Sequence, residues 1–198
     1  MHTTITIEDA ERIDSPLYAG LRMSADEYLQ LPDDEFKYEL VDGVVVLSPS
    51  PEPKHQQVLS EVIYQLKAYL RSHPAGSCYP ETDIRLDVKL VYRPELVFLR
   101  KERVRENWKR IQCAPDLVLE VISPESRRYD AETKKGDYER FGVKEYWLID
   151  PYQQMMLFYR LESGRFVEVQ PQGDKLISEA VPGFILDLAA VRSSFEPL

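Results

Sequence analysis

Two acidic residues stand in stretches of the chain that are otherwise apolar. Glu120 lies within "APDLVLEVIS" (residues 114–123), and Glu95 follows Pro94 at the start of "ELVFLR". Both stretches are typical of buried β-strands. Because an unpaired carboxylate buried in a core costs several kcal/mol, each acid must face a crevice, a cation or a hydrogen-bonding partner.

The alternation of side chains along a strand predicts which residues accompany each acid. Glu120 shares a face with Asp116, Val118 and Ile122, and Glu95 shares one with Arg93, Val97 and Leu99. If the two strands are neighbours, the carboxylates converge and repel each other unless a cation lies between them. Mg²⁺ prefers oxygen ligands and often uses one or two carboxylates together with water and phosphate. The pair therefore predicts a Mg²⁺ site, with Mn²⁺ as a substitute. The competing interpretation leaves Glu95 in water and pairs Glu120 with an arginine.

A lysine lies on the predicted inner face of the helix that follows Glu120. The stripe at spacings of three or four consists of Ala131, Lys134, Tyr138 and Phe141. Lys134 is the candidate to direct an ammonium group at the Glu120 crevice, where it would orient a water or offset charge on a phosphate. Lys135 is the second choice. In the alternative interpretation the Lys134 stem only snorkels to solvent, and Asp130 only caps the helix.

Several elements are expected to position these residues. Ser24 and Glu27 form a capping box for a short helix that ends near Pro32. The Asp42-Gly43 pair between two extended runs predicts a hairpin. A long helix follows, with a stripe formed by His55, Leu59, Val62, Leu66 and Leu70 that packs on the sheet and has His55 at its N-terminal end.

The rest of the chain alternates between strands and helices. Strands are predicted in "TDIRLDVKL", "RPELVFLR" and "APDLVLEVIS", a helix in "AETKKGDYERF", and strands in "EYWLID", "MMLFYRL" and "FVEV". The segment "VPGFILDL" is apolar, and its type stays open. This order predicts one central mixed β-sheet with helices packed on its faces, an α/β fold.

Composition narrows the class of protein. The 198 residues fit one domain, and the two cysteines show no metal-ligand spacing. The beginning of the sequence lacks a basic and apolar leader pattern, so we expect a cytoplasmic, thiol-reduced protein. No apolar run approaches the roughly 20 residues of a membrane span, so no membrane contact is expected. The net charge of −9 argues against nonspecific coating of nucleic acid but allows a local basic groove.

Two basic segments are candidates for such a groove. The stretch "RKERVRENWKR" (residues 100–110) gathers six basic residues around Trp108, and Arg127 and Arg128 precede the candidate helix. Such a surface would hold a phosphate backbone. The alternative is a solvated linker of mixed charge, since Glu102 and Glu106 dilute the first segment.

The order of these motifs resembles a known pattern. Pro94-Glu95, then Glu120 in "DLVLEVIS", then a basic residue, is similar to the PD-(D/E)XK nuclease superfamily, which has the restriction endonuclease-like fold. The segments "YELVDGVVVLSPSPEPKHQ", "APDLVLEVISPESRRYDAETKKGDYERFGVKEYWLIDP" and "VPGFILDL" resemble the Uma-two family of restriction endonuclease-like proteins. The similarity covers residues 23–191 as one nuclease-like domain, which leaves residues 1–22 as an arm, expected to be loose, and 192–198 as a tail.

The resemblance implies an αβββαβ core, Mg²⁺-dependent hydrolysis of DNA phosphodiesters, and a metal site at Glu95 and Glu120. Two departures matter: Glu95 stands where Asp is usual, and Ile122 occupies the position of the superfamily lysine, so that Lys134 must supply the amine. Glu39 and His55 match family positions near the site, although Glu39 could serve only the hairpin and His55 only the helix end.

Two functions follow from this pattern. The first is a metal-dependent DNA endonuclease, for which a homodimer would suit the cutting of both strands of a duplex. The second is a catalytically inactive domain of the same fold that binds nucleic acid or protein. The sequence offers no base-recognition helix from which a sequence preference could be predicted.

Overall fold

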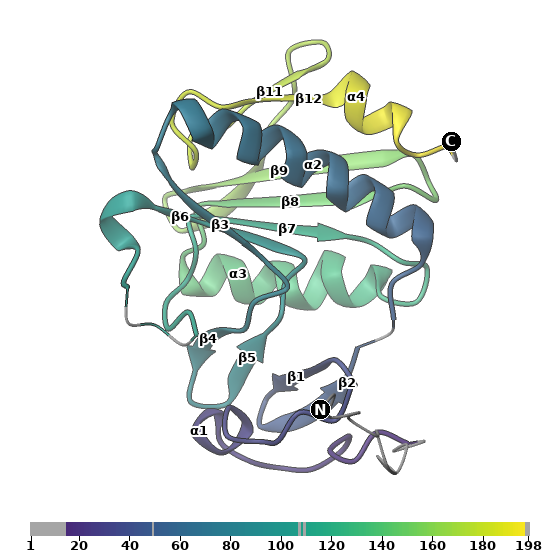
Figure 1. Cartoon of the computed structure of the whole chain (residues 1–198), viewed down its shortest axis with the longest axis vertical. Helices are drawn as coiled ribbons and strands as arrows, with labels where there is room; N and C mark the ends of the chain where they lie inside the picture. Colours follow the sequence, from purple (N-terminus) through teal and green to yellow (C-terminus); the bar gives the residue numbers. More distant parts are fainter. Residues whose placement is uncertain (1–14, 49, 107, 109, 197–198) are drawn as a thin grey trace, which may run out of the picture.

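A six-stranded mixed sheet forms the centre of the molecule (Figure 1). The computed structural model describes residues 15–48, 50–106, 108 and 110–196. The strand order is β10-β9-β8-β7-β6-β3, with β7 and β8 parallel and the other neighbours antiparallel. The strands are β3 (Gly76–Pro80), β6 (Leu96–Arg100), β7 (Leu117–Val121), β8 (Glu145–Asp150), β9 (Met155–Glu162) and β10 (Arg165–Glu168). The prediction of a central mixed sheet flanked by helices is confirmed.

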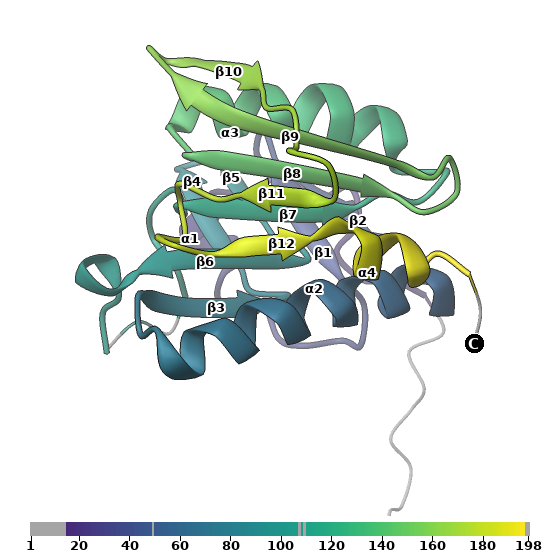
Figure 2. The same ribbon diagram turned by 90° about the horizontal axis from the view of Figure 1, so that it is seen from above.

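The helices lie on opposite faces of this sheet (Figure 2). One face is covered by α2 (Pro53–Ser72) together with the C-terminal elements β11 (Lys175–Ile177), β12 (Ile185–Asp187) and α4 (Leu188–Ser193). The other face is covered by α3 (Lys135–Phe141). The apolar segment "VPGFILDL" thus contains strand β12, and its last residue, Leu188, is the first residue of α4.

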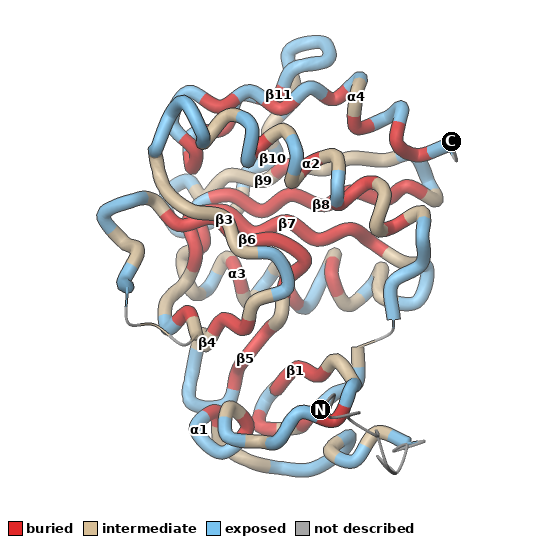
Figure 3. The backbone as a smooth tube through the Cα atoms, viewed as in Figure 1, coloured by how far each residue is buried: buried red, intermediate tan, exposed pale blue. Residues whose placement is uncertain are grey.

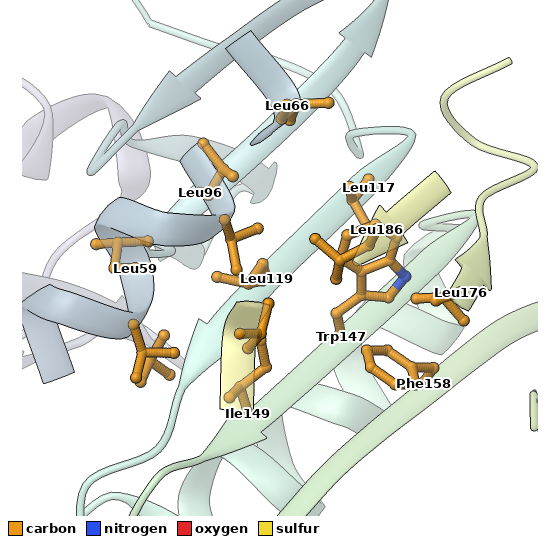
Figure 4. Close-up of a cluster of buried hydrophobic side chains, with 14 of the residues drawn as sticks. Leu59, Leu66, Leu96, Leu117, Leu119, Trp147, Ile149, Phe158, Leu176 and Leu186 are labelled. Atoms are coloured by element: carbon orange, nitrogen blue, oxygen red, sulfur yellow. The ribbon is translucent and has the colours of Figure 1, made fainter. Parts of the chain in front are cut away.

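The α2 face is a continuous apolar core (Figure 4). The α2 stripe of Val58, Leu59, Val62 and Leu66 is buried against Leu96, Leu117, Leu119, Trp147 and Ile149 of the sheet. Pro53 begins the helix at a position where its missing N–H costs no hydrogen bond. The predicted stripe of the long helix is therefore confirmed, and the middle strands of the sheet are buried along their length (Figure 3).

A second, antiparallel sheet lies beside the central one (Figure 1). Its order is β2-β1-β5-β4, formed by β1 (Tyr38–Val41), β2 (Val44–Leu47), β4 (Ile84–Asp87) and β5 (Leu90–Tyr92). The predicted hairpin is present, with Asp42 at φ 50° and Gly43 at φ 77° in its turn. The capping box of Ser24 and Glu27 starts α1 (Ala25–Tyr28) as predicted.

One strand prediction is wrong in its placement. The segment "TDIRLDVKL" forms β4 and the start of β5 in the second sheet, and β3 supplies the edge strand of the central sheet instead. The β3 segment begins with Gly76 and ends with Pro80, so it lacks an apolar alternation. A Cβ on Gly76 would lie 2.1 Å from the Leu99 carbonyl oxygen, so a glycine is needed where β3 approaches β6.

The helix that carries Lys134 begins earlier than predicted. A π-helical turn, η2 (Tyr129–Lys134), leads directly into α3, which ends at Gly142 with φ 83°. Asp130 lies inside this turn, its backbone N–H donates to the Ser126 carbonyl oxygen, and its side chain is buried. The interpretation of Asp130 as the helix cap is therefore wrong.

The ends of the chain are described in part. Residues 1–14 of the expected N-terminal arm fall outside the described residues. Beyond them, the Gly20 N–H donates to the Val45 carbonyl oxygen at 2.8 Å, and the Val45 N–H donates to that of Leu21 at 2.8 Å. The expected tail begins inside α4. No helix in the described part of the chain has the length and apolar character needed to cross a membrane.

Candidate active site

A cavity of about 250 Å³ lies where the second sheet, the N-terminal end of α2 and the η2 turn meet the central sheet. One part of its wall is apolar, with Val46, Leu47 and Pro51. The remainder is densely charged. The titratable residues that line it are Lys37, Glu39, His55, Arg93, Glu95, Glu120, Glu125, Tyr129, Asp130 and Lys134.

Glu95 and Glu120 are brought together by strand pairing. In the β6–β7 register Leu96 lies opposite Leu119, so Glu95, just before β6, falls opposite Glu120. The Glu95 N–H donates to Glu120 Oε2 at 3.3 Å. Both side chains are buried, and Glu120 contacts a lysine rather than an arginine. The prediction that these two strands are neighbours is confirmed.

Lys134 reaches the same cavity from the η2 turn. Its Nζ lies 2.9 Å from Glu39 Oε1, 3.1 Å from Glu120 Oε1 and 3.5 Å from Asp130 Oδ1. Lys135 points elsewhere, and its Nζ lies 4.0 Å from the centre of the Tyr159 ring. The predicted choice of Lys134 as the inward lysine agrees with this geometry. π-Helical turns are rare and are frequent at functional sites; this one contributes both Asp130 and Lys134 to the cavity.

Burial and crowding of like charges shift the pKa values of this cluster. Burial raises the pKa of Glu120 to about 8, the carboxylates of Asp130, Glu39 and Glu95 act in the same direction, and Lys134 opposes them. Burial also raises the pKa of Asp130. Burial alone would lower the pKa of Lys134, but its three carboxylate neighbours hold it well above its ordinary value. The lysine is therefore charged, and Glu120 and Asp130 are costly to ionise.

Glu95 is held through one oxygen only. Lys37 Nζ donates to Glu95 Oε1 at 3.0 Å, and His55 Nε2 lies 3.7 Å from the same oxygen. Glu95 Oε2 is buried and has no hydrogen-bond partner among the described residues, and the same holds for His55 Nδ1. Burial of a carboxylate oxygen without a hydrogen-bond partner is costly. Glu95 Oε2 is therefore available to coordinate a metal ion or to accept a hydrogen bond.

The charges of the site do not balance. Four carboxylates, those of Glu39, Glu95, Glu120 and Asp130, face the two ammonium groups of Lys37 and Lys134. When all are ionised, two negative charges remain, which one divalent cation would neutralise. Arg93 also lines the cavity, but its guanidinium group is bound to Asp83 at 2.7 and 3.3 Å.

The donor set fits a hard cation such as Mg²⁺. Glu95 and Glu120 would coordinate a metal ion through carboxylate oxygens, the type of ligand that Mg²⁺ prefers. The described residues contain no group of three or more His, Cys, Asp or Glu side chains arranged to hold a metal ion. A cation at Glu95 and Glu120 would therefore bind two carboxylates and complete its shell with water and phosphate oxygens, which is common for Mg²⁺.

Several of the predicted basic residues form ion pairs with buried acids. Arg127 pairs with Asp150 at 2.7 Å. In the basic stretch, Arg103 pairs with Asp116 at 2.7 Å and Arg110 with Asp83 at 3.1 Å, while residues 107 and 109 lie outside the described part. Arg128 differs, because its side chain is 89% exposed and contacts only the exposed Glu132 among the described residues.

Sequence reasoning missed Lys37 and underrated Asp130. Lys37 and Glu39 are two residues apart on an extended segment, so alternation places them on one face. With Glu39 as a candidate, this alternation predicts that Lys37 also faces the site. Asp130 and Lys134 are four residues apart, a spacing at which helical side chains meet.

Comparison with known proteins identifies the family of this chain and a solved structure of similar fold. The model of the Uma2 family, described as "Putative restriction endonuclease", matches residues 25–189. The chain belongs to the Uma2 family. Its structure is similar to the crystal structure of a "putative nuclease belonging to DUF820" from Anabaena variabilis, with a TM-score of 0.74 and 20% sequence identity. The match covers 88% of this Uma2 chain and 99% of that one. No curated protein matches the chain.

These findings confirm the family resemblance and the fold class predicted for this Uma2 protein. At 20% identity the likeness to the Anabaena protein shows the fold alone. The family description points to a nuclease, and the reaction of this chain must be argued from its own residues.

Proposed function

We propose that this protein is a Mg²⁺-dependent endonuclease that hydrolyses DNA phosphodiesters, with Glu95 and Glu120 holding the cation and Lys134 assisting. Mn²⁺ would substitute for Mg²⁺. The observation that carries this proposal is the pair of buried carboxylates on neighbouring strands, one of which has an oxygen without a hydrogen-bond partner among the described residues, in a cavity also lined by Glu39, Asp130 and two lysines. The family description supports the same reaction class.

The residues around the acids hold them in place for this role. When bound, the cation supplies Lewis acidity for phosphodiester hydrolysis. Glu120 is fixed through both oxygens, because Lys134 and the Tyr138 hydroxyl donate to Oε1 at 3.1 and 3.0 Å and the Glu95 N–H donates to Oε2. Lys134 thus assists by fixing Glu120 and by offsetting the charge of its neighbours.

Glu39 has an accessory role at the same centre. The Arg93 N–H donates to Glu39 Oε1 at 3.0 Å, and Lys134 contacts the same oxygen. Glu39 therefore links the second sheet to the charged cluster. His55 lies at the N-terminal end of α2. Its imidazole is close to the Glu95 carboxylate, which would bind the cation.

DNA is the proposed partner, and a homodimer is the proposed assembly. Arg128 directly precedes η2 and is 89% exposed, which supports a contact with the DNA backbone outside the cavity. Two copies related by a twofold axis would present two cavities to the two strands of a duplex.

Plasmid nicking tests the proposed reaction. The wild type should convert supercoiled plasmid with Mg²⁺ or Mn²⁺, and EDTA should abolish the reaction. Glu120→Gln should be inactive, while the matched control Glu168→Gln, an exposed acid on β10, should cut like the wild type. DNA binding without cleavage of any plasmid, duplex or single strand would favour the catalytically inactive nuclease-fold domain.

A further inference from the structure

The two lysines of the cavity differ in how many carboxylates contact their ammonium groups. Lys134 is 8% exposed, and three carboxylates surround its Nζ within 3.5 Å. Three is also the number of N–H donors in an ammonium group. The rings of Tyr92 and Tyr129 lie 5.4 and 5.3 Å from the same Nζ. A move of Lys134 toward a substrate would leave buried acids without their counter-charge, which is strongly unfavourable.

Lys37 is less occupied and lies nearer to solvent. Its side chain is 18% exposed, and in the described part of the chain its Nζ makes one hydrogen bond, to Glu95 Oε1 at 3.0 Å. Its second ionic neighbour, Glu81, is 48% exposed and 3.6 Å away, a contact of the kind that contributes little energy. Two N–H donors of Lys37 are therefore available to an incoming acceptor.

The other basic side chains of the cavity wall are engaged. The Arg93 guanidinium group is bound to Asp83. His55 is buried against Glu95. Lys37 is thus the lining cation that combines partial exposure, available donors and direct contact with a proposed metal ligand.

We propose that Lys37 is the residue of the cavity wall that contacts a DNA phosphate, and that Lys134 is a positioning residue that holds Glu39, Glu120 and Asp130. This inference rests on the proposed function. Lys37 precedes Glu39 by two residues on one face of the extended segment, so the two side chains enter the cavity together. The Lys37 side chain is partly exposed and contacts Glu95. The Glu39 side chain is buried more deeply and contacts Lys134.

Binding of a fluorescein-labelled DNA duplex in EDTA tests this assignment without cleavage. Lys37→Met should weaken binding about tenfold and lower the salt dependence by about one phosphate contact. Lys37→Arg keeps the charge and should bind like the wild type. The matched control is Lys67→Met, because Lys67 is exposed in the C-terminal half of α2, whereas only the N-terminal end of this helix borders the cavity.

Lys134→Met should behave differently in the same experiment. Its duplex affinity and salt slope should stay within about twofold of the wild type, and it should gain more thermal stability from Mn²⁺, because the cation replaces the lost counter-charge. A merely structural lysine would not change the response to Mn²⁺.

The outcomes separate this inference from the proposed reaction. Unchanged duplex binding by folded Lys37→Met, or a larger loss from Lys134→Met, would overturn the assignment of Lys37, and so would a failure of Lys37→Arg to restore binding. A wild type that binds the duplex in EDTA but never cleaves it with Mg²⁺ would overturn only the hydrolytic function. A wild type that neither binds the duplex in EDTA nor nicks plasmid with Mg²⁺ or Mn²⁺ would overturn both.

Discussion

The two faces of strand β7 carry different kinds of residue. Leu117, Leu119 and Val121 face α2 and belong to a buried core without charged side chains. On the other face, Glu120 stands between Val118 and Ile122 and meets the lysine of the η2 turn. A single strand thus supplies packing energy on one side and a charged site on the other, so mutations on the two faces should separate stability from activity.

Glu120→Gln should have the largest effect on activity and should spare the fold. Loss of one carboxylate from a two-carboxylate site should lower turnover by at least about 1,000-fold, roughly 4 kcal/mol in the barrier. Divalent-metal binding should be lost as well, which calorimetry with Mn²⁺ would measure. Unchanged Mn²⁺ affinity would return Glu120 to a structural role.

Lys134→Met should lower both stability and activity, although it keeps the apolar stem. Removal of the ammonium group leaves Glu39, Glu120 and Asp130 as uncompensated buried acids, at a cost of about 3–5 kcal/mol in the free energy of unfolding. Urea denaturation in EDTA measures this cost. Stability equal to the wild type would show that the carboxylates do not depend on Lys134.

Leu119→Ala tests the opposite face of the same strand. Leu119 is fully buried in the α2 core, so the cavity left by truncation should cost about 2–5 kcal/mol in the free energy of unfolding. Turnover per folded molecule at low temperature should stay within about threefold of the wild type. A collapse of activity in folded protein would show that the two faces are not separable.

The sequence was sufficient for the residues that lie on regular strands. Alternation placed Glu95 and Glu120 on matching faces, and the run of strands made them neighbours. Helical phase separated Lys134 from Lys135. These predictions depend only on local periodicity and on one pairing between strands.

The other features of the fold and the site depend on contacts between residues that are far apart in the sequence. Lys37 and Glu95 are 58 residues apart and meet only because the second sheet docks beside the central one. The sequence Gly76–Pro80 gives no strand pattern, so β3 could not be predicted and "TDIRLDVKL" was placed in the wrong sheet. The π-helical turn has no local signature either, so the sequence alone allows Asp130 to be interpreted as a helix cap.

The pH dependence of stability should distinguish Glu120 from its glutamine variant in EDTA. The pKa of Glu120 is raised from 4.5 to about 8 in the folded state, so the folded state binds a proton more tightly than the unfolded state. Wild-type stability should therefore fall as pH rises from about 4.5 to about 8. Glu120→Gln lacks this term, so its melting temperature should exceed that of the wild type by a few degrees at about pH 8.5 and by less at about pH 5. An advantage that grows toward low pH would contradict the raised pKa.

Lys135→Met should have the smallest effect and sharpens the contrast between neighbouring lysines. The Lys135 ammonium group lies over the Tyr159 ring, a contact worth about 0.5–1 kcal/mol at an exposed site. We expect a loss of stability within that range and, because the charge lies outside the cavity, only a weak, salt-sensitive loss of DNA binding. Plasmid nicking at two salt concentrations, with Lys135→Arg as the control that keeps the charge, measures the second effect. Equal losses of turnover from Lys134→Met and Lys135→Met would indicate a general basic surface, and the separate role of the inward lysine would then be wrong.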